Sequence, residues 1–186
     1  MNRRLTITAV IAVLLGIIVV SYSNRRQDNP KATAALPTIP SGHSEDSITT
    51  SVHVYYADNT CGYLVAEERS ITVPNNPMAK GKAIIGLLIR GPKGKLMQTL
   101  PSSATLRDFY LTPKGVAVVD FNNLTTDHPG GAQMELMSLY AIVNSLALNI
   151  DEINAVKFLI NGQESSTLAG HLDIRFPYKA NMLIVK

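Results

Sequence analysis

Hydrophobic patterning divides the chain into an N-terminal apolar segment and a longer region of short alternating elements. Residues 5–22 are almost all apolar, and two arginines lie on each side of them. Eighteen residues at 1.5 Å each make about 27 Å of helix, close to the hydrocarbon thickness of a bilayer. This pattern predicts a membrane anchor over residues 1–23, and we favour an uncleaved signal anchor with the long C-terminal part exported. Cleavage as a secretory signal peptide is the alternative, because Ser21 and Ser23 have the small-x-small form of a cleavage site.

The segment after the anchor has a different composition. Residues 24–50 carry Pro30, Pro37 and Pro40 and show neither helical nor strand periodicity, which is typical of a disordered tether. As a flexible coil its ends would lie roughly 30 Å apart, and up to about 80 Å if it extended toward polyproline II. Residues 51–186 remain, and their number suits one compact domain.

Period-2 alternation predicts several strands in this domain. Residues 51–56 place Val52, Val54 and Tyr56 on one face of the first strand. The turn signal around Gly115 predicts a hairpin between two later strands, and the Asn161-Gly162 pair ends a buried strand. The remaining predicted strands cover residues 63–65, 70–73, 106–111, 116–121, 156–160 and, at an edge, 182–185.

Two helices complete the pattern. Asn76 can cap the first, Pro77 suits its first position, and Gly91 with Pro92 ends it. The second is predicted over residues 132–149 from apolar residues at helical spacing. The order of strands, helix, hairpin, helix and strand predicts an α+β fold, with two helices packed on one face of a three- to four-stranded, antiparallel-rich sheet.

The second helix has two apolar strips. The core strip consists of Leu136, Leu139, Tyr140, Val143, Leu146 and Ile150. The second strip, about 140° round the helix, consists of Met134, Met137, Ala141 and Leu148. One sheet cannot cover both, so the second strip is a candidate interaction surface for another copy or an envelope protein. The sequence leaves open whether the N-terminal strands, or the loop over residues 163–177, cover it within one chain.

Charge and cysteine content exclude some classes of function. The formal charge of +3 includes four arginines beside the anchor, which leaves 13 lysines and arginines against 14 acidic residues from Gln27 onward. The basic isoelectric point therefore belongs to the anchor flanks and gives no reason to expect nucleic acid as a partner. Cys61 is the single cysteine, so the exported domain has no internal disulfide framework.

Two groups of polar residues have the composition of chemical sites. The first group is Asp120, Asp127, His128 and Glu135. It is spread over a strand end, a loop and a helix start, where acidic residues favour turns and helix ends, so we do not interpret it as a metal site. The second group is Ser165, Ser166, His171 and Asp173. As a hydrolytic set, these residues would supply the nucleophile, the base and the acid from a single nine-residue loop. The loop also lacks the Gly-x-Ser-x-Gly turn that presents a nucleophilic serine. We therefore expect no catalytic, metal or cofactor site and no enzymatic activity.

A set of segments in a fixed order carries a family resemblance. The segments are Leu87–Pro92, Leu100–Leu106, Gly115–Phe121, Ala141–Leu146, Val156–Gln163 and Thr167–Asp173, followed by Pro177. Across nearly all of residues 51–186, they resemble the GerMN domain family of sporulation and spore germination proteins. The resemblance implies an exported, membrane-tethered domain with a ring-building-motif-like two-layer sandwich, which serves in envelope or spore-associated assemblies and has no known catalytic residues.

The same resemblance implies roles for individual residues and for the whole protein. The motif residues at turns and strand ends, implied to be fold determinants, are Gly91, Pro92, Asp120, Gly162, Gly170 and His171. Many family members look like lipoproteins, whereas this chain lacks a cysteine at the end of its apolar run. We expect a single-pass membrane protein whose extracytoplasmic domain is a non-catalytic assembly or interaction module. A ligand-binding or sensory module for a cell-wall or small-molecule ligand is the alternative, and it predicts a pocket near His171, Asp173 and Asp120.

Overall fold

The computed structural model describes residues 46–122, 124 and 131–186. The predicted anchor, the predicted tether up to residue 45, and the candidate ligands Asp127 and His128 lie outside the described residues. Ser44–Lys186 form one compact unit with its own hydrophobic core. In the part of the chain that the structure describes, no helix combines the length and apolar character needed to cross a bilayer.

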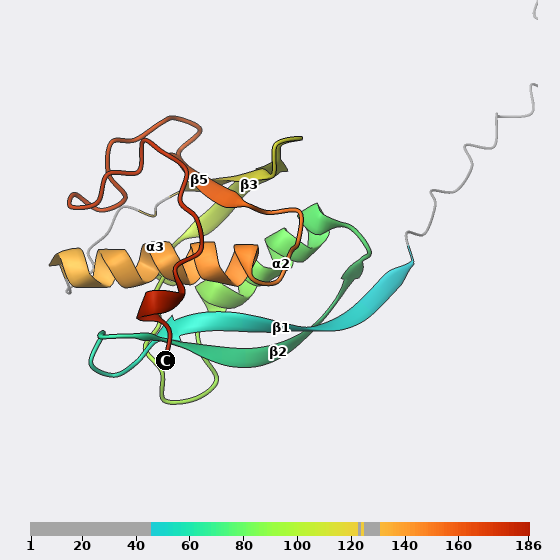
Figure 1. Ribbon diagram of the computed structural model, residues 1–186, viewed down its shortest axis with the longest axis horizontal. Helices are drawn as coiled ribbons and strands as arrows, with labels where there is room; N and C mark the ends of the chain where they lie inside the picture. Colours follow the sequence, from blue (N-terminus) through green and yellow to red (C-terminus); the bar gives the residue numbers. More distant parts are fainter. Residues whose placement is uncertain (1–45, 123, 125–130) are drawn as a thin grey trace, which may run out of the picture. The chain divides into compact units, whose positions relative to one another are not determined.

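The described chain contains five strands, two α-helices and a short 3₁₀ helix (Figure 1). In order they are β1 (Ser47–Ala57), β2 (Leu64–Pro74), α2 (Pro77–Arg90), β3 (Thr105–Leu111), β4 (Val116–Asn122), α3 (Gly131–Ala147), β5 (Ala155–Ile160) and η1 (Met182–Ile184). β1 and β2 form an antiparallel two-stranded sheet. The other sheet has the order β3-β4-β5, in which β4 pairs antiparallel with β3 and parallel with β5.

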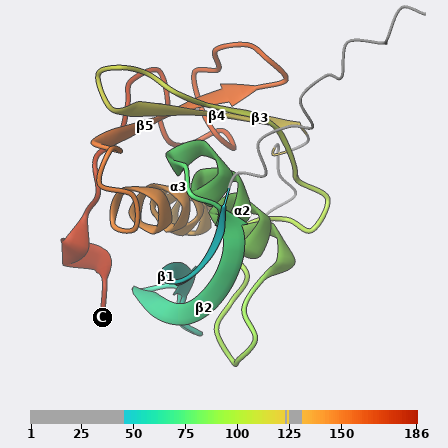
Figure 2. The same cartoon turned by 90° about the vertical axis from the view of Figure 1, so that its right-hand side faces the viewer.

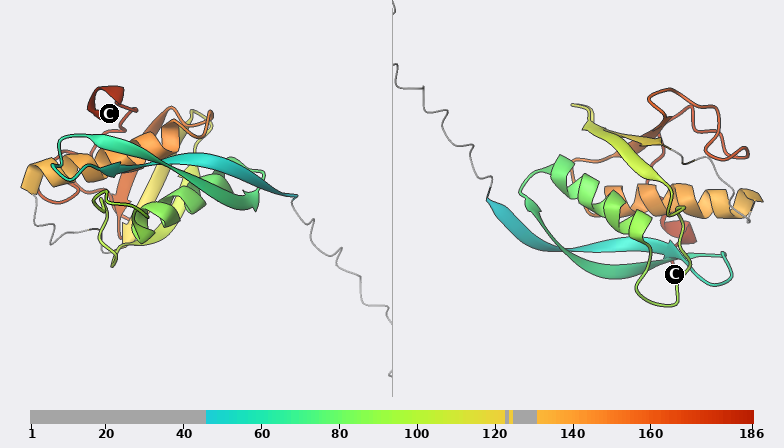
Figure 3. Two further views of the ribbon diagram at one scale, coloured as in Figure 1. Left: turned by 90° about the horizontal axis from the view of Figure 1, so that it is seen from below. Right: turned by 180° about the vertical axis from the view of Figure 1, so that it is seen from behind.

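The two helices lie between the two sheets (Figure 2). α2 packs against β3 on one side and against β1 and β2 on the other, and α3 packs against β1 and β5. Seen from below, the β1–β2 hairpin lies across both helices (Figure 3). The predicted α+β class is confirmed, and both helices cover one face of the three-stranded sheet. The N-terminal strands add a separate sheet on the far side of the helices.

Local sequence signals account for the bounds of α2. The side chain of Asn76 accepts a hydrogen bond from the Ala79 N–H (2.7 Å), and Pro77 occupies the first turn. At the other end Gly91 has φ +81°, and its N–H donates to the carbonyls of Leu87 and Leu88 (3.1 and 3.2 Å). Such a left-handed residue favours glycine and ends the helix, as the sequence predicts.

β1 is fixed to α3 by side chains as well as by packing. Val52, Val54 and Tyr56 are fully buried, as the alternation predicts. Along the open edge of the strand, the Tyr55 N–H donates to Ser145 Oγ (2.9 Å). Asn149 accepts from the His53 N–H (2.9 Å) and donates from Nδ2 to the His53 carbonyl (2.7 Å). Ser145 of α3 and Asn149 in the turn after it therefore satisfy backbone groups that a third strand would otherwise pair.

The candidate interaction strip of α3 is largely covered within the chain. Met134, Met137 and Ala141 are buried and belong to the core, while Leu148 is 42% exposed. The sheet formed by β1 and β2 supplies a second apolar layer against the helices, which a single sheet could not provide. Of the two interpretations left open by the sequence, coverage within one chain is the arrangement observed. Three of the four side chains are unavailable to a neighbouring molecule while the domain is folded.

Three predicted strands differ from the structure. The expected short strands at 63–65 and 70–73 are one continuous strand, β2, paired with β1 along its whole length. The predicted edge strand at 182–185 is wrong, because residues 182–184 form η1. The side chain of Asn181 accepts from the Leu183 N–H (3.0 Å) and caps this turn. Only Val185 bridges to a strand, at Leu64 of β2.

The last residues, 174–186, form a segment that we call the strap. Tyr178 exchanges two backbone hydrogen bonds of 2.8 Å with Val156 at the edge of β5. Asn181 exchanges two hydrogen bonds of 2.9 Å with the side chain of Asn144 on α3. The Lys186 N–H then donates to the Leu64 carbonyl of β2 (2.9 Å). The strap thus crosses α3 from one sheet to the other (Figure 1).

Candidate functional site

Glu135 on α3 organises the loop that contains the predicted hydrolytic residues. Its side chain is 1% exposed. Oε1 accepts hydrogen bonds from the backbone N–H groups of Ala169 (2.7 Å) and Leu172 (3.0 Å). Oε2 accepts from the His171 N–H (2.9 Å) and lies 2.9 Å from Nδ1 of the same histidine. One buried carboxylate therefore holds three residues of the loop, Ala169, His171 and Leu172, from within the protein.

The environment of Glu135 favours its charged form. Burial raises the pKa of the carboxyl, but the backbone N–H donors of Leu172 and Ala169, together with His171, outweigh burial and hold the pKa below its ordinary value. Hydrogen bonds to a carboxylate stabilise the ionised state directly, and this is why three amides can keep a buried acid charged. The carboxylate is a negative anchor for the loop and not a proton donor at neutral pH.

Asp120 at the end of β4 holds a second turn. Its Oδ1 accepts from the Gly162 N–H (2.9 Å), and its Oδ2 lies 3.4 Å from Nη1 of Arg107. The turn residues Asn161 and Gly162 have φ +54° and φ +78°, the signature of a two-residue type I′ turn. A Cβ built on Gly162 would lie 1.8 Å from Arg107 Nη1, so this position needs glycine for conformation and for space.

Of the four candidate metal ligands, the structure describes Asp120 and Glu135, and these two have separate partners. Asp120 is engaged with the Gly162 turn and Glu135 with the loop at 169–172, as described above. Asp127 and His128 lie outside the described residues. Among residues 46–122, 124 and 131–186, no group of three or more His, Cys, Asp or Glu side chains is placed to hold a metal ion.

The residues of the hypothetical hydrolytic set have other partners. Ser165 Oγ donates to the Thr167 carbonyl (2.8 Å), and His171 Nδ1 faces Glu135. Asp173 forms an ion pair with Arg175 (2.7 Å), and this side-chain contact lowers the Asp173 pKa to about 2. The base and the acid of the proposed triad therefore bind different neighbours, and the serine hydroxyl bonds to its own loop. This is the arrangement expected of residues that order a loop.

One hollow of about 200 Å³ opens at the opposite end of α3 from Glu135. It is lined by Ile48, Val73, Pro74, Asn75, Asn76, Pro77, Lys80, Asn149, Ile150, Asp151 and Glu152. Lys80 Nζ donates to the Asn149 carbonyl there (2.5 Å). The pocket expected near His171, Asp173 and Asp120 is not this hollow, since none of the three lines it. Its volume is below the roughly 300 Å³ at which pockets for drug-sized ligands begin.

The other motif residues lie at chain reversals. Gly91 ends α2, and its carbonyl accepts hydrogen bonds from Tyr56 OH (3.2 Å) and Arg69 Nη2 (2.9 Å). Pro92 follows it, where it prevents continuation of the helix. Gly170 has φ +104°, within the loop that Glu135 holds. These placements agree with roles in the fold, which remain a prediction until the residues are substituted.

Sequence reasoning assigned Glu135 to the helix start and missed its contacts with the loop. The signal was present in the helical spacing, because Glu135 precedes the buried Leu139 by four residues and the buried Ile142 by seven. An acid on a buried helix face needs hydrogen-bond donors from elsewhere in the chain. Sequence alone could not identify those donors, since backbone N–H groups leave no mark in the residue types.

Comparison with known proteins identifies the family. A family model described as Germane, sporulation and spore germination, matches residues 53–166. This range covers more than half of the chain, from β1 to the loop held by Glu135. A comparison with curated proteins found no match.

Solved structures show the same fold. The first GerMN domain of the sporulation protein GerM from Bacillus subtilis is 19% identical with a TM-score of 0.55, over 71% of this chain and 98% of that one. The tandem GerMN domains of GerM are 16% identical with a TM-score of 0.52, and the match covers 75% of this chain and 47% of that one. A chain described as a candidate lipoprotein from Clostridium perfringens is 24% identical with a TM-score of 0.52, and the match covers 72% of this chain and 87% of that one. With the family match across β1 to the 163–177 loop, these likenesses establish that the chain belongs to the Germane family of sporulation and spore germination domains.

Proposed function

We propose that the chain is a non-catalytic interaction module of the cell envelope, held to the membrane by its N-terminal segment. The observation that carries the non-catalytic part is the engagement of Glu135, whose buried carboxylate is occupied by three loop amides and His171. A base–acid pair used in catalysis has to face a space where a substrate can bind. Here the Glu135 carboxylate, on α3, faces the backbone of the loop that it holds.

The proposed architecture has three parts. Residues 1–23 are the membrane anchor and residues 24–46 are a tether, shorter than the predicted 24–50 because residues 47–50 belong to β1. The interaction domain follows from residue 47 to residue 186, located on the extracytoplasmic side. Membership of the sporulation and spore germination family supports an envelope role. The likeness in fold to a chain described as a candidate lipoprotein is consistent with it. The proposed partner is another envelope protein or a second copy of this chain.

Location is the first property to test, with the full chain expressed in intact cells. We expect it in the membrane fraction, and we expect external protease to degrade the domain in protoplasts without lysis. Deletion of residues 2–23 is the matched control, and it should leave the domain soluble and protected inside the cell. Recovery of the full chain from the soluble cytosolic fraction would contradict the proposal.

Partner capture and activity assays test the interaction role. Crosslinking on intact cells, followed by identification of the captured protein, should give a discrete adduct that the anchor deletion loses. On a panel of cell-wall fragments we expect no turnover by the wild type. Turnover that His171→Ala abolishes, with an unchanged urea midpoint, would instead make the loop a catalytic site.

A further inference from the structure

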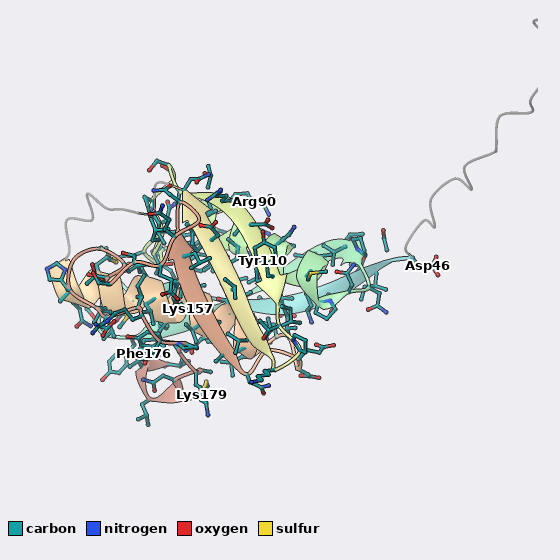
Figure 4. The ribbon with its side chains drawn as sticks, turned by 90° about the horizontal axis from the view of Figure 1, so that it is seen from above. Asp46, Arg90, Tyr110, Lys157, Phe176 and Lys179 are labelled. Atoms are coloured by element: carbon teal, nitrogen blue, oxygen red, sulfur yellow. The ribbon has the colours of Figure 1, made fainter. Side chains whose placement is uncertain are left out.

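The strap exposes the most accessible large hydrophobic side chains of the described residues. Leu183 is 91% exposed, Phe176 68% and Met182 54%, and each exceeds every other large hydrophobic side chain in the described ranges. Isolated exposed hydrophobics are ordinary on protein surfaces, but here three of them lie within eight residues of one ordered segment, and we call these three side chains the apolar patch. Figure 4 shows Phe176 at the same edge of the molecule as Lys179 and the C-terminal segment, beyond Lys157 of β5.

The exposure follows from how the strap is fastened. Its backbone is bound to β5 at Tyr178, to α3 at Asn181 and to β2 at Lys186. Its inward positions are already filled: Ile174 is fully buried, and the Tyr178 ring meets Tyr140 edge-on at a centroid distance of 5.9 Å. Ile174 and Tyr178 face the protein, whereas Phe176, Met182 and Leu183 are exposed. The apolar side chains therefore project from an ordered segment.

The charge of the strap has one sign. It contains Arg175, Lys179 and Lys186, and no Asp or Glu occurs between Ile174 and Lys186. Arg175 is neutralised by its ion pair with Asp173, which leaves Lys179 and Lys186 as the other basic side chains of the strap. Elsewhere from Gln27 onward acidic residues outnumber basic ones, so the strap is positive against a slightly negative background. A surface of negative charge with an apolar interior complements such a patch.

We propose that the strap docks on the surface of an anionic lipid bilayer. Phe176, Met182 and Leu183 enter the boundary between headgroups and acyl chains, and Lys179 and Lys186 contact anionic headgroups. Apolar side chains flanked by lysines suit this boundary, whereas lysine is depleted at protein–protein interfaces. The proposal depends on the proposed function only for the nearness of a membrane, which a tether of roughly 30 Å to 80 Å would keep within reach.

The test uses residues 44–186, which form a compact unit with its own core and lack the anchor. Wild-type protein is sedimented with vesicles of phosphatidylcholine, with and without phosphatidylglycerol. We expect binding to the vesicles that contain phosphatidylglycerol and its loss in high salt, because exposed charges are screened. The double variant Met182→Asn with Leu183→Asn should lower the partition coefficient about tenfold or more, since two side chains no longer enter the apolar layer.

Two controls keep the result specific. Met78→Asn changes a side chain of similar exposure (48%) on α2, and it should leave binding unchanged. Lys179→Glu should weaken binding to vesicles with phosphatidylglycerol, and the urea midpoint of every variant should match the wild type. No wild-type binding to these vesicles, or an equal loss in Met78→Asn, would overturn the proposal.

The outcome is separable from the proposed function. The fragment has no anchor, so its failure to bind vesicles says nothing about where the full chain resides. If the double variant binds vesicles like the wild type but loses a crosslinked protein in intact cells, the patch is a protein site and the lipid proposal is overturned. A loss of vesicle binding with the crosslink retained supports it.

Discussion

The loop at 163–173 and the strap at 174–186 are adjacent in the chain, and each is fixed through its backbone in a different way. In the loop, the backbone N–H groups of Ala169, His171 and Leu172 turn inward to the buried carboxylate of Glu135. In the strap, the backbone is fastened and the apolar side chains turn outward. Ser165, His171 and Asp173, which resemble a catalytic set, form contacts with the loop itself, with Glu135 and with Arg175. The plain apolar residues next to them form the surface that a partner can reach.

Replacing Glu135 should have the largest effect on stability. Glu135→Ala leaves three loop amides and His171 without their acceptor inside the protein, so we expect a loss of about 3 kcal/mol or more in the free energy of unfolding. Urea denaturation measures it. Glu164→Ala is the control, because that side chain is 75% exposed and its loss should cost less than about 1 kcal/mol. Equal losses in the two variants would remove Glu135 as the anchor of the loop.

The Gly162 turn should be the next most sensitive position. Gly162→Ala forces an alanine to φ +78° and pushes against Arg107, for an expected loss of about 1–2 kcal/mol. Gly86→Ala is the matched control within α2, where an added Cβ meets nothing within 4 Å. That variant should gain about 0.5–1 kcal/mol, because glycine is a poor helix former. A loss at both positions would contradict the structural role assigned to the turn.

Acid should remove the stabilisation that the Glu135 carboxylate gives to the loop. The pKa of Glu135 is lower in the folded state than its ordinary value of 4.5. Its stabilising contribution is therefore complete above about pH 4.5 and is lost as pH falls through the depressed folded pKa. We expect the difference in unfolding free energy between wild type and Glu135→Gln to shrink as pH falls below that value. A difference that stays constant down to the folded pKa would show that the ionised carboxylate is not what holds the loop.

Substitutions on the outer side of the strap should have the smallest effect on the free energy of unfolding. Leu183→Asn is expected to change the free energy of unfolding by less than about 0.5 kcal/mol, because the side chain is 91% exposed. Ile174→Val, at a fully buried position of the same segment, should cost about 1 kcal/mol. Thermal or urea unfolding of the pair measures how sharply the two sides of the strap differ. If Leu183→Asn costs more than Ile174→Val, the outward patch is part of the fold.

Features fixed by neighbouring residues could be predicted from the sequence. The Asn76 cap, Pro77 and Gly91 defined α2, and Asn161-Gly162 defined a turn, because each acts within a few residues. The ordered motifs also identified the family, which the family match confirms.

Features that depend on distant residues could not be predicted in this way. Glu135 meets its loop donors 34 to 37 residues later, and Asn149 meets His53 across 96 residues. The separate β1–β2 sheet depends on such contacts, and it explains why a second apolar strip on α3 needs no partner chain. Residues 182–185 have the composition of a strand, but residues 182–184 form a 3₁₀ turn that the Asn181 side chain caps. Composition alone does not decide between these two structures.

The side-chain contacts along β1 have a consequence for crowded conditions. Unpaired amides and carbonyls at a sheet border are templates on which foreign strands polymerise. At positions 53 and 55 those groups are already taken by Asn149 and Ser145. Molecules concentrated on one surface would thus find these edge groups unavailable for fibre growth, because one polar residue of α3 and one in the turn after it already bind them.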